Sequence, residues 1–273
     1  MIVAYLGPDG SFSHLLTRRR FPDATDLRPF AGVPDVFEFV RATPGALGVV
    51  PIENSSGGMI MPTVDSLMEH TQCVFVQELL LLDVKLALLG RAGRVPEIVY
   101  SHAVPLQHSE KWLKRTYPAA AAVASKSTSH AVKLAVDDRT AAAIAQRELA
   151  EPNGLDVLHF PIEEGVPNIP QFYVIGHERA HTGDCSAYVV ALPNKPGALY
   201  RFLAPFNEHG VNLTRIQSRP IFGKPNAHLF FIELTGHEDA PNVAAAIAAA
   251  SSPEISERMD SLGSFPAKLR FQS

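Results

Sequence analysis

The sequence IVAYLGPDGSFSH, residues 2–14, passes from a short apolar run directly into a turn rich in glycine and serine. The apolar run is typical of a buried strand, and serine after a glycine turn is typical of a helix start. Backbone N–H groups at a helix start have no partner inside the helix and lie at the positive end of its dipole. This stretch therefore predicts a strand, a turn and a helix whose first turn suits an anion.

The same change from an apolar run to a polar helix start recurs further along the chain. Short apolar runs alternate with helical patterns from residue 1 to about 176, which predicts an α/β domain with parallel sheets. The expected strands are residues 2–6, 47–52, 80–89, 98–100, 121–124, 141–144 and 172–175. The further polar helix starts are ENSSGG at residues 53–58, SH at 101–102 and SKSTSH at 125–130.

Ligands of open α/β sheets bind in crevices beyond the carboxyl ends of the strands. Four such corners converging on one crevice would hold a small anion with more than one carboxylate. Helix capping alone explains any single corner, and only the joint pattern favours a ligand site. The sequence carries no nucleotide fingerprint, zinc motif or nucleophile elbow, so neither a cofactor nor a metal is expected.

A second domain is expected after the segment GHERAHTGD, residues 176–184, which lacks apolar periodicity and predicts a linker. Its elements follow in the order strand, helix, strand, strand, helix, last segment. That order predicts a small α+β sandwich of the split βαβ kind. The ranges are residues 186–192, 197–208, 212–218, 227–235, 241–250 and a last segment near 267–271.

The composition excludes several classes of protein. Hydrophobic residues make up 46% and charged residues 19% of the chain, as in a globular protein. The net charge of −4, with no basic run beyond Arg18-Arg19-Arg20, gives no nucleic-acid footprint. Cys73 and Cys185 form no disulfide framework, and the apolar N-terminal run is too short for a signal peptide or a membrane span. We expect a cytoplasmic protein that binds neither nucleic acid nor membranes.

Long motifs in the chain resemble those of prephenate dehydratases. They are YLGPDGSFSH at residues 5–14 and VPIENS at 50–55, with Gly58 and DSL at 65–67. NKPGAL at 194–199 and NLTRIQSRP at 212–220 resemble the phenylalanine-binding motifs of that family's ACT domain. The resemblance implies a two-lobed catalytic domain, built like type II periplasmic binding proteins, over residues 1–178. Its second lobe would span about residues 80–155, and a ferredoxin-like α+β ACT domain would span residues 185–273.

The end of the catalytic region departs from the family. Where relatives have Asn-x-Thr-Arg-Phe, this chain reads NIPQF at residues 168–172. The resemblance gives the threonine hydroxyl a part in the chemistry and the arginine a part in holding a substrate carboxylate. Pro170 has neither hydroxyl nor N–H, and Gln171 lacks the charged fork of a guanidinium. Lys85 and Lys126 are candidates for the missing cation, although a lysine extending from a strand edge explains Lys85 equally well.

The corners and the resemblance together give the candidate site residues. The catalytic candidates are Ser11, Asn54, Ser55, Ser127, Thr128, Gln171 and Phe172. The substrate-binding candidates are Phe12, Ser13, Ser56, Lys85, Ser101, His102 and Lys126. The effector-binding candidates are Gly197, Ala198, Leu199, Asn212 and Leu213.

Three functions are compatible with these residues. The leading hypothesis is a lyase that decarboxylates prephenate but retains the ring hydroxyl, giving a dihydro-4-hydroxyphenylpyruvate. Loss of CO₂ needs mainly positioning and a poorly solvated carboxylate, whereas expulsion of the hydroxyl needs an acid. The alternative is a prephenate dehydratase that makes phenylpyruvate for phenylalanine synthesis, with Thr128 or Ser127 as the acid, and the ACT domain favours it. The third is a catalytically silent amino-acid sensor.

The ACT resemblance also implies partners. L-phenylalanine would be the effector, bound at a subunit contact, and the protein would be a homodimer or homotetramer. Gln217 stands where the motif usually has a glutamate, so we expect weaker or altered selectivity for the effector.

Overall fold

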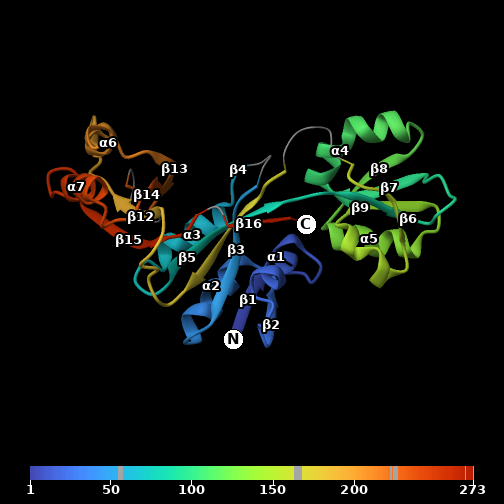
Figure 1. Ribbon diagram of the computed structural model, residues 1–273. Coiled ribbons are helices and arrows are strands. Elements are labelled where there is room, and N and C mark those ends of the chain that lie inside the picture. Colours follow the sequence, from blue (N-terminus) through green and yellow to red (C-terminus); the bar gives the residue numbers. More distant parts are fainter. Residues whose placement is uncertain (55–57, 163–167, 222, 224–226, 268, 273) are drawn as a thin grey trace.

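The computed structural model describes residues 1–54, 58–162, 168–221, 223, 227–267 and 269–272, which form three sheets with their helices. In Figure 1 the first lobe (blue) lies between the second lobe (green) and the C-terminal domain (orange and red). Among the described residues, no helix is long and apolar enough to cross a bilayer.

The first lobe is built on a sheet with the strand order β16-β5-β11-β3-β1-β2, to which β4 adds by pairing with β3. Val33, Val36, Phe37 and Val40 recur at helical spacing, and α2 buries this stripe in the core of the lobe. The strands are β1 (Ile2–Leu6), β2 (Asp26–Phe30), β3 (Leu47–Asn54), β4 (Gly58–Met59), β5 (Phe75–Asp83), β11 (Gln171–Gly176) and β16 (Leu269–Gln272). The helices are α1 (Phe12–Arg20), α2 (Val33–Ala42) and α3 (Met61–Glu69).

The second lobe has a sheet with the strand order β10-β6-β9-β7-β8. Ala135 of its helix α5 and Ala143 of the central strand β9 are fully buried in one cluster, because small side chains let the helix lie close to the sheet. The elements are β6 (Ala87–Gly90), β7 (Ile98–His102), α4 (Ala103–Thr116), β8 (Ala121–Ser125), α5 (Thr128–Asp137), β9 (Ala141–Ala145), η1 (Arg147–Leu149), η2 (Glu151–Asn153) and β10 (Asp156–His159).

The sequence prediction was wrong where the chain passes between the lobes. Residues 80–89 were expected as one strand, but β5 ends at Asp83 in the first sheet and β6 begins at Ala87 in the second. The strands on either side of the crossings run against their neighbours: β11 is antiparallel to β3 and β5, and β6 is antiparallel to β9 and β10. Both sheets are therefore mixed, whereas the sequence predicted parallel ones.

The C-terminal domain is an antiparallel sheet with the order β13-β14-β12-β15 and two helices on one face. Phe202 and Val243 of the helices pack against Ile232 of that face. The opposite face, with Phe231 and Phe265, joins the core of the first lobe. The elements are β12 (Cys185–Ala191), α6 (Ala198–Glu208), β13 (Leu213–Pro220), β14 (His228–Thr235), α7 (Pro241–Ala250) and β15 (Arg258–Phe265).

The end of the chain differs from the expectation. The segment near 267–271 was expected to close the C-terminal domain, but β16 pairs in parallel with β5 of the first lobe. The fourth strand of the C-terminal sheet is β15, with the sequence RMDSLGSF. Its few large apolar residues give no strand-like alternation, so local pattern favours the more apolar segment that follows it.

Candidate active site

A cavity of about 340 Å³ lies between the two lobes, at the ends of strands from both sheets. Each of the four corners predicted from the sequence contributes to its wall. Its lining residues are Leu6, Gly7, Pro8, Ser11, Phe12, Ser13, Pro51, Glu53, Asn54, His102, Val104, Pro105, Lys126, Ser127, Thr128, Asn168, Pro170 and Phe172. Polar helix starts and apolar surfaces thus meet in one space, as a ring that carries carboxylates would require.

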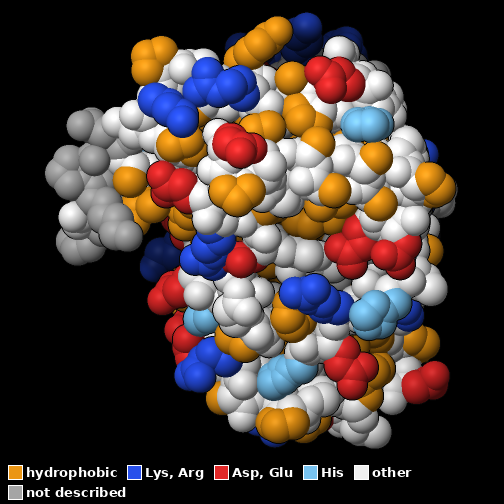
Figure 2. All heavy atoms as spheres, turned by 90° about the vertical axis from the view of Figure 1, so that its left-hand side faces the viewer, with side chains coloured by type: hydrophobic (Ala, Val, Ile, Leu, Met, Phe, Trp, Pro, Cys, Tyr) orange, Lys and Arg blue, Asp and Glu red, His pale blue; other side chains and the backbone are white. Residues whose placement is uncertain are grey.

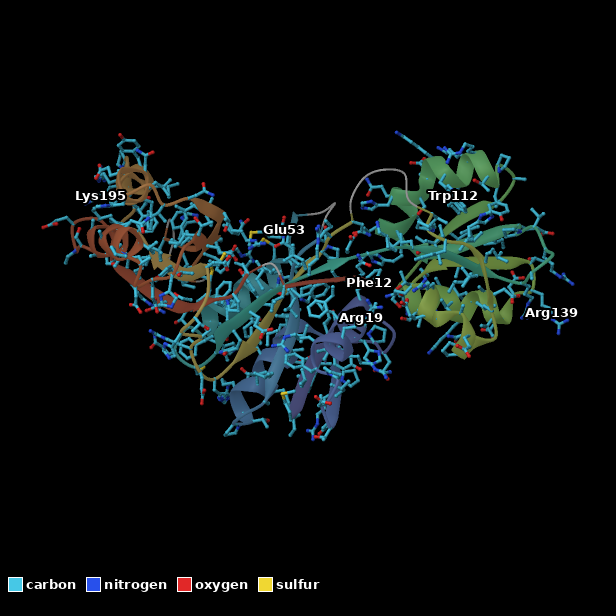
Figure 3. The ribbon with its side chains drawn as sticks, viewed as in Figure 1. Phe12, Arg19, Glu53, Trp112, Arg139 and Lys195 are labelled. Atoms are coloured by element: carbon cyan, nitrogen blue, oxygen red, sulfur yellow. The ribbon has the colours of Figure 1, made fainter. Side chains whose placement is uncertain are left out.

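The corner after β1 is held by a local network of hydrogen bonds. Ser11 caps α1 by accepting from the N–H of His14 at 3.2 Å, and its hydroxyl donates to the carbonyl of Leu6 at 3.2 Å. Gly10 has a φ of 75°, and its N–H donates to Nδ1 of His14 at 2.8 Å. The ring of His14 stacks on Tyr5 with centroids 5.1 Å apart. Figure 3 shows Phe12 at the start of α1, on the side of the first lobe that faces the second.

His14 is an unsuitable proton donor at neutral pH. Burial lowers its pKa below the usual value, and this outweighs the opposite effect of Asp9. Its Nδ1 already accepts from Gly10. We therefore infer that His14 stabilises the turn and does not transfer a proton.

The corner after β8 places two hydroxyls at the cavity. Ser127 caps α5 by accepting from the N–H of His130 at 3.0 Å. Thr128 is the first residue of the helix, and its hydroxyl donates to Oε1 of Gln146 at 3.3 Å. Only 4% of Thr128 is exposed, so its hydroxyl is shielded from bulk water while it lines the cavity.

At the corner after β7 the two candidates have different surroundings. His102 lines the cavity and caps α4, with Nδ1 accepting from the N–H of Val104 at 3.5 Å. Ser101 is fully buried, and its hydroxyl donates to the carbonyl of Ile144 in β9 at 2.6 Å. Its contact ties two strands together and does not face the cavity.

In the altered segment, residues 168–172, neighbouring side chains have different surroundings. Asn168, Pro170 and Phe172 line the cavity, whereas Gln171 accepts a hydrogen bond from Arg215 of the C-terminal domain at 2.5 Å. Successive side chains of a strand point to opposite faces, which explains why Gln171 leaves the cavity to its neighbours. Gln171 is therefore not a wall residue, although it was a catalytic candidate.

The candidates for the missing cation are separated in the same way. Lys126 lines the cavity. Lys85 is not among the lining residues, and its Nζ lies 3.7 Å from a carboxylate oxygen of Asp83. Ser55 and Ser56, the remaining candidates of the second corner, lie outside the described residues.

Sequence reasoning missed part of the wall. Glu53 lies in the VPIENS motif but was not among the candidates, although a charged residue at a strand end was a usable signal. Pro8, Pro51 and Pro105 also line the cavity; Pro8 and Pro51 lie in the quoted motifs, but prolines in a sequence indicate turns, so none of the three was a candidate.

The effector candidates lie on the C-terminal domain. Gly197 precedes α6 with a φ of 76°, Ala198 begins the helix, and Leu199 is 38% exposed. Leu213 is the first residue of β13, and Asn212 directly precedes it. Figure 2 looks onto this end of the molecule and shows hydrophobic side chains interspersed with charged ones.

Comparisons with known proteins identify the families that the two regions match. The family model described as prephenate dehydratase matches residues 3–180, and the one described as ACT domain matches residues 189–251. A bifunctional chorismate mutase/prephenate dehydratase from Pseudomonas aeruginosa is 35% identical over 97% of this chain and 73% of its own length.

Solved structures match the chain over nearly its whole length. A prephenate dehydratase from Arthrobacter aurescens in complex with L-Phe has a TM-score of 0.86 at 29% identity, covering 97% of this chain and 90% of its own. A structure described as GqqA, a novel type of quorum quenching acylase, has a TM-score of 0.86 at 26% identity and covers 98% of each chain. With family matches in both regions and these relatives over nearly its whole length, the chain belongs to the prephenate dehydratase family of lyases and carries an ACT domain.

Proposed function

We propose that this protein is a prephenate dehydratase, which converts prephenate to phenylpyruvate, CO₂ and water. The observation that supports this proposal is the cavity, in which helix starts capped by hydroxyls from both lobes lie with Lys126 and an apolar wall. Sequence relatives that match most of the chain are named prephenate dehydratase, alone or fused to chorismate mutase, whereas one solved structure of similar coverage is described as an acylase. This reverses the preference drawn from the sequence alone, which favoured decarboxylation with retention of the hydroxyl.

The cavity residues divide the chemistry between them. The N–H groups at the starts of α1 and α5, together with Lys126, hold the carboxylates of the substrate. Phe12 and Phe172 give the ring an apolar surface, where the ring carboxylate is less solvated. The ring carboxylate leaves as CO₂, its bonding electrons enter the ring, and the C–O bond to the ring hydroxyl breaks. The hydroxyl of Thr128 or Ser127 donates the proton with which that group leaves as water, and the hydroxyl regains a proton from water; Thr128 would first turn its hydroxyl from Gln146 toward the leaving oxygen.

One observation favours a second candidate function. Pro170 lines the cavity and offers neither a hydroxyl nor an N–H at a point where the resemblance implies a threonine hydroxyl in relatives. Without an acid at that point, the ring hydroxyl would stay and the product would be a decarboxylated dihydro-4-hydroxyphenylpyruvate. Protonation of a ring carbon would then replace protonation of the leaving oxygen.

The product of the reaction separates these functions. Purified protein is incubated with prephenate, and the product is identified by its ultraviolet spectrum and its mass. Phenylpyruvate supports the dehydratase, and a decarboxylated product that keeps the ring oxygen supports the second candidate. Tight binding of prephenate or L-phenylalanine without turnover would reject both and leave an amino-acid-sensing protein.

We also propose that L-phenylalanine binds the ACT domain at a subunit contact and inhibits the enzyme. The proposal is supported by the sequence motifs at 194–199 and 212–220 and by the related structure in complex with L-Phe. Calorimetry is expected to show binding that weakens or disappears when Gly197 is replaced by valine, because its φ of 76° disfavours side chains other than glycine. Absence of heat at millimolar L-phenylalanine would reject the proposal. Light scattering would show whether the protein is a dimer or a tetramer.

A further inference from the structure

We propose that Arg215, a residue of the ACT domain, is a positioning residue of the catalytic cavity that holds Glu53 in its wall; this inference rests on the proposed function. The side chain of Arg215 is 7% exposed and reaches from β13 into the first lobe. The cavity would then be completed by a residue from outside the catalytic domain.

The guanidinium of Arg215 contacts both domains at once. Its Nε and Nη2 donate to Oε2 of Glu53 at 3.2 and 3.0 Å, and Nη2 also donates to Oε1 of Gln171 at 2.5 Å. On the ACT side, Nη1 lies 2.5 Å from Oε1 of Glu233. Only a planar fork with several donors can meet partners in these directions at the same time.

The strand registers explain why these groups meet. Arg215 is the cross-strand neighbour of Glu233 in the ACT sheet, and Glu53 is the cross-strand neighbour of Gln171 in the first sheet. Figure 3 shows Glu53 at the end of the first lobe that faces the ACT domain. Each sheet thus directs one polar pair at the other.

The polar contacts lie within an apolar interface. Phe231 and Phe265 of the ACT sheet pack with Tyr173 of β11, whose hydroxyl donates to Glu233. Burial disfavours the charge on Arg215, but the surrounding groups, Glu233 among them, raise its pKa above the usual value. The guanidinium therefore stays charged at the domain boundary.

The contact with Glu53 matters to the cavity because of the charge of the substrate. Prephenate carries two carboxylates, and Glu53, one of the residues that line the cavity, carries a third. Like charges in a partly desolvated space repel, and a guanidinium hydrogen-bonded to Glu53 offsets that repulsion. Arg215 also fixes Gln171, the residue between the wall residues Pro170 and Phe172.

The test compares arginine variants in the full-length enzyme. Arg215→Met is expected to lower kcat/KM for prephenate at least about tenfold, mainly through KM, because it leaves Glu53 unpaired in the wall. Arg215→Lys keeps the charge but loses the fork, and we expect an intermediate effect. Arg258→Met is the matched control. Arg258 donates to Thr71 at 2.8 Å across the same domain boundary, and neither residue lines the cavity. The kcat/KM of Arg258→Met is expected to stay within about twofold of the wild-type value.

A double variant separates positioning from mere stability. Adding Glu53→Gln to Arg215→Met removes the uncompensated charge, so KM is expected to fall back toward that of the wild type. Thermal midpoints identify variants that fail to fold, and if Arg215→Met does not fold, the KM of Arg215→Lys decides the question. Equal losses in Arg215→Met and Arg258→Met, no recovery in a folded double variant, or an unchanged KM in Arg215→Lys would overturn the inference while the proposed function stands. A wild type that neither converts nor binds prephenate would overturn both.

Discussion

In the proposed dehydratase reaction, Thr128 is one of the two candidates for the acid of the dehydration step. Its hydroxyl lies at the cavity, at the start of α5, and is held by the buried amide of Gln146. Thr128→Val keeps the shape of the side chain but removes the hydroxyl, and we expect kcat to fall about 10²- to 10⁴-fold with a much smaller change in KM. Thr128→Ser keeps the hydroxyl and should retain most of the activity. Steady-state kinetics with prephenate measure both.

A wild-type kcat in Thr128→Val would transfer the role of acid to Ser127. A substitution of Ser127 is harder to interpret, because Ser127 also caps α5 by accepting a hydrogen bond from the N–H of His130. Loss of such a cap costs about 0.5–2 kcal/mol of stability, so an effect of Ser127→Ala on activity has to be compared with its thermal midpoint.

His14 links the turn after β1 to the pH dependence of stability. Because burial lowers its pKa in the folded state, the unfolded chain takes up a proton at a higher pH than the folded protein does. The contribution of His14 is therefore present above the unfolded pKa, near 6.5, and is lost as the pH falls through the lower folded pKa. His14→Gln is expected to make the free energy of unfolding less dependent on pH below neutrality, as measured by urea unfolding at a series of pH values. Parallel curves for the two proteins would contradict this assignment.

Local chemistry explains which elements and site residues could be predicted from the sequence. A helix start and the strand before it are encoded within about ten residues, so the corners carrying Ser11, His102 and Ser127 are recognisable in the sequence alone. The orientation of the Gln171 side chain toward the ACT domain, and the contact of Arg215 with Glu53, depend on pairing between strands far apart in the chain, which no local pattern encodes. The unexpected edge strands β2 (DLRPF) and β10 (DVLH) are only five and four residues long, and β2 contains Pro29, so neither shows the longer run of β-branched and aromatic residues by which strands are recognised.

The start of strand β11 gives a prediction at the scale of an element, because the two faces there have separate tasks: Pro170, just before the strand, lines the cavity, and Gln171, its first residue, contacts the ACT domain. Pro170→Thr adds a hydroxyl to the cavity wall and leaves the contact between Gln171 and Arg215 in place. If protonation of the leaving group limits the reaction, we expect phenylpyruvate formation to rise at least about tenfold. The measurement is the rate of phenylpyruvate formation, together with its share of the total product.

Gln171→Leu is the matched change on the opposite face of β11. It leaves Arg215 without one of its acceptors, and we expect a loss of about 1–3 kcal/mol in stability without the gain in phenylpyruvate. Urea unfolding and the same product analysis distinguish the two variants. An increase in phenylpyruvate in Gln171→Leu would show that the two faces are not independent.

At the scale of the whole molecule, the catalytic domain and the ACT domain share one core. Val76 and Tyr173 of the first lobe and Phe231 and Phe265 of the ACT sheet belong to one buried cluster. After the ACT sheet the chain returns to the first lobe, where β16 pairs with β5. The ACT domain is thus inserted in the chain between segments of the first lobe and is not simply appended after it.

This arrangement predicts that residues 1–178 are unstable alone. Removing the rest of the chain takes away β16 and exposes large side chains such as Tyr173 and Val76, which are fully buried in the intact protein. Each large apolar side chain that becomes exposed costs about 1.5–3 kcal/mol, against a total stability of about 5–15 kcal/mol for a typical domain. We expect the fragment to aggregate, as measured by gel filtration, or to unfold at a clearly lower temperature than the full chain, as measured by circular dichroism.

Co-expression of residues 1–178 with residues 179–273 is the control. It should restore a folded complex, because the contacts that hold the two parts together are non-covalent. A monodisperse 1–178 fragment with the thermal midpoint of the intact protein would show that the shared core is dispensable.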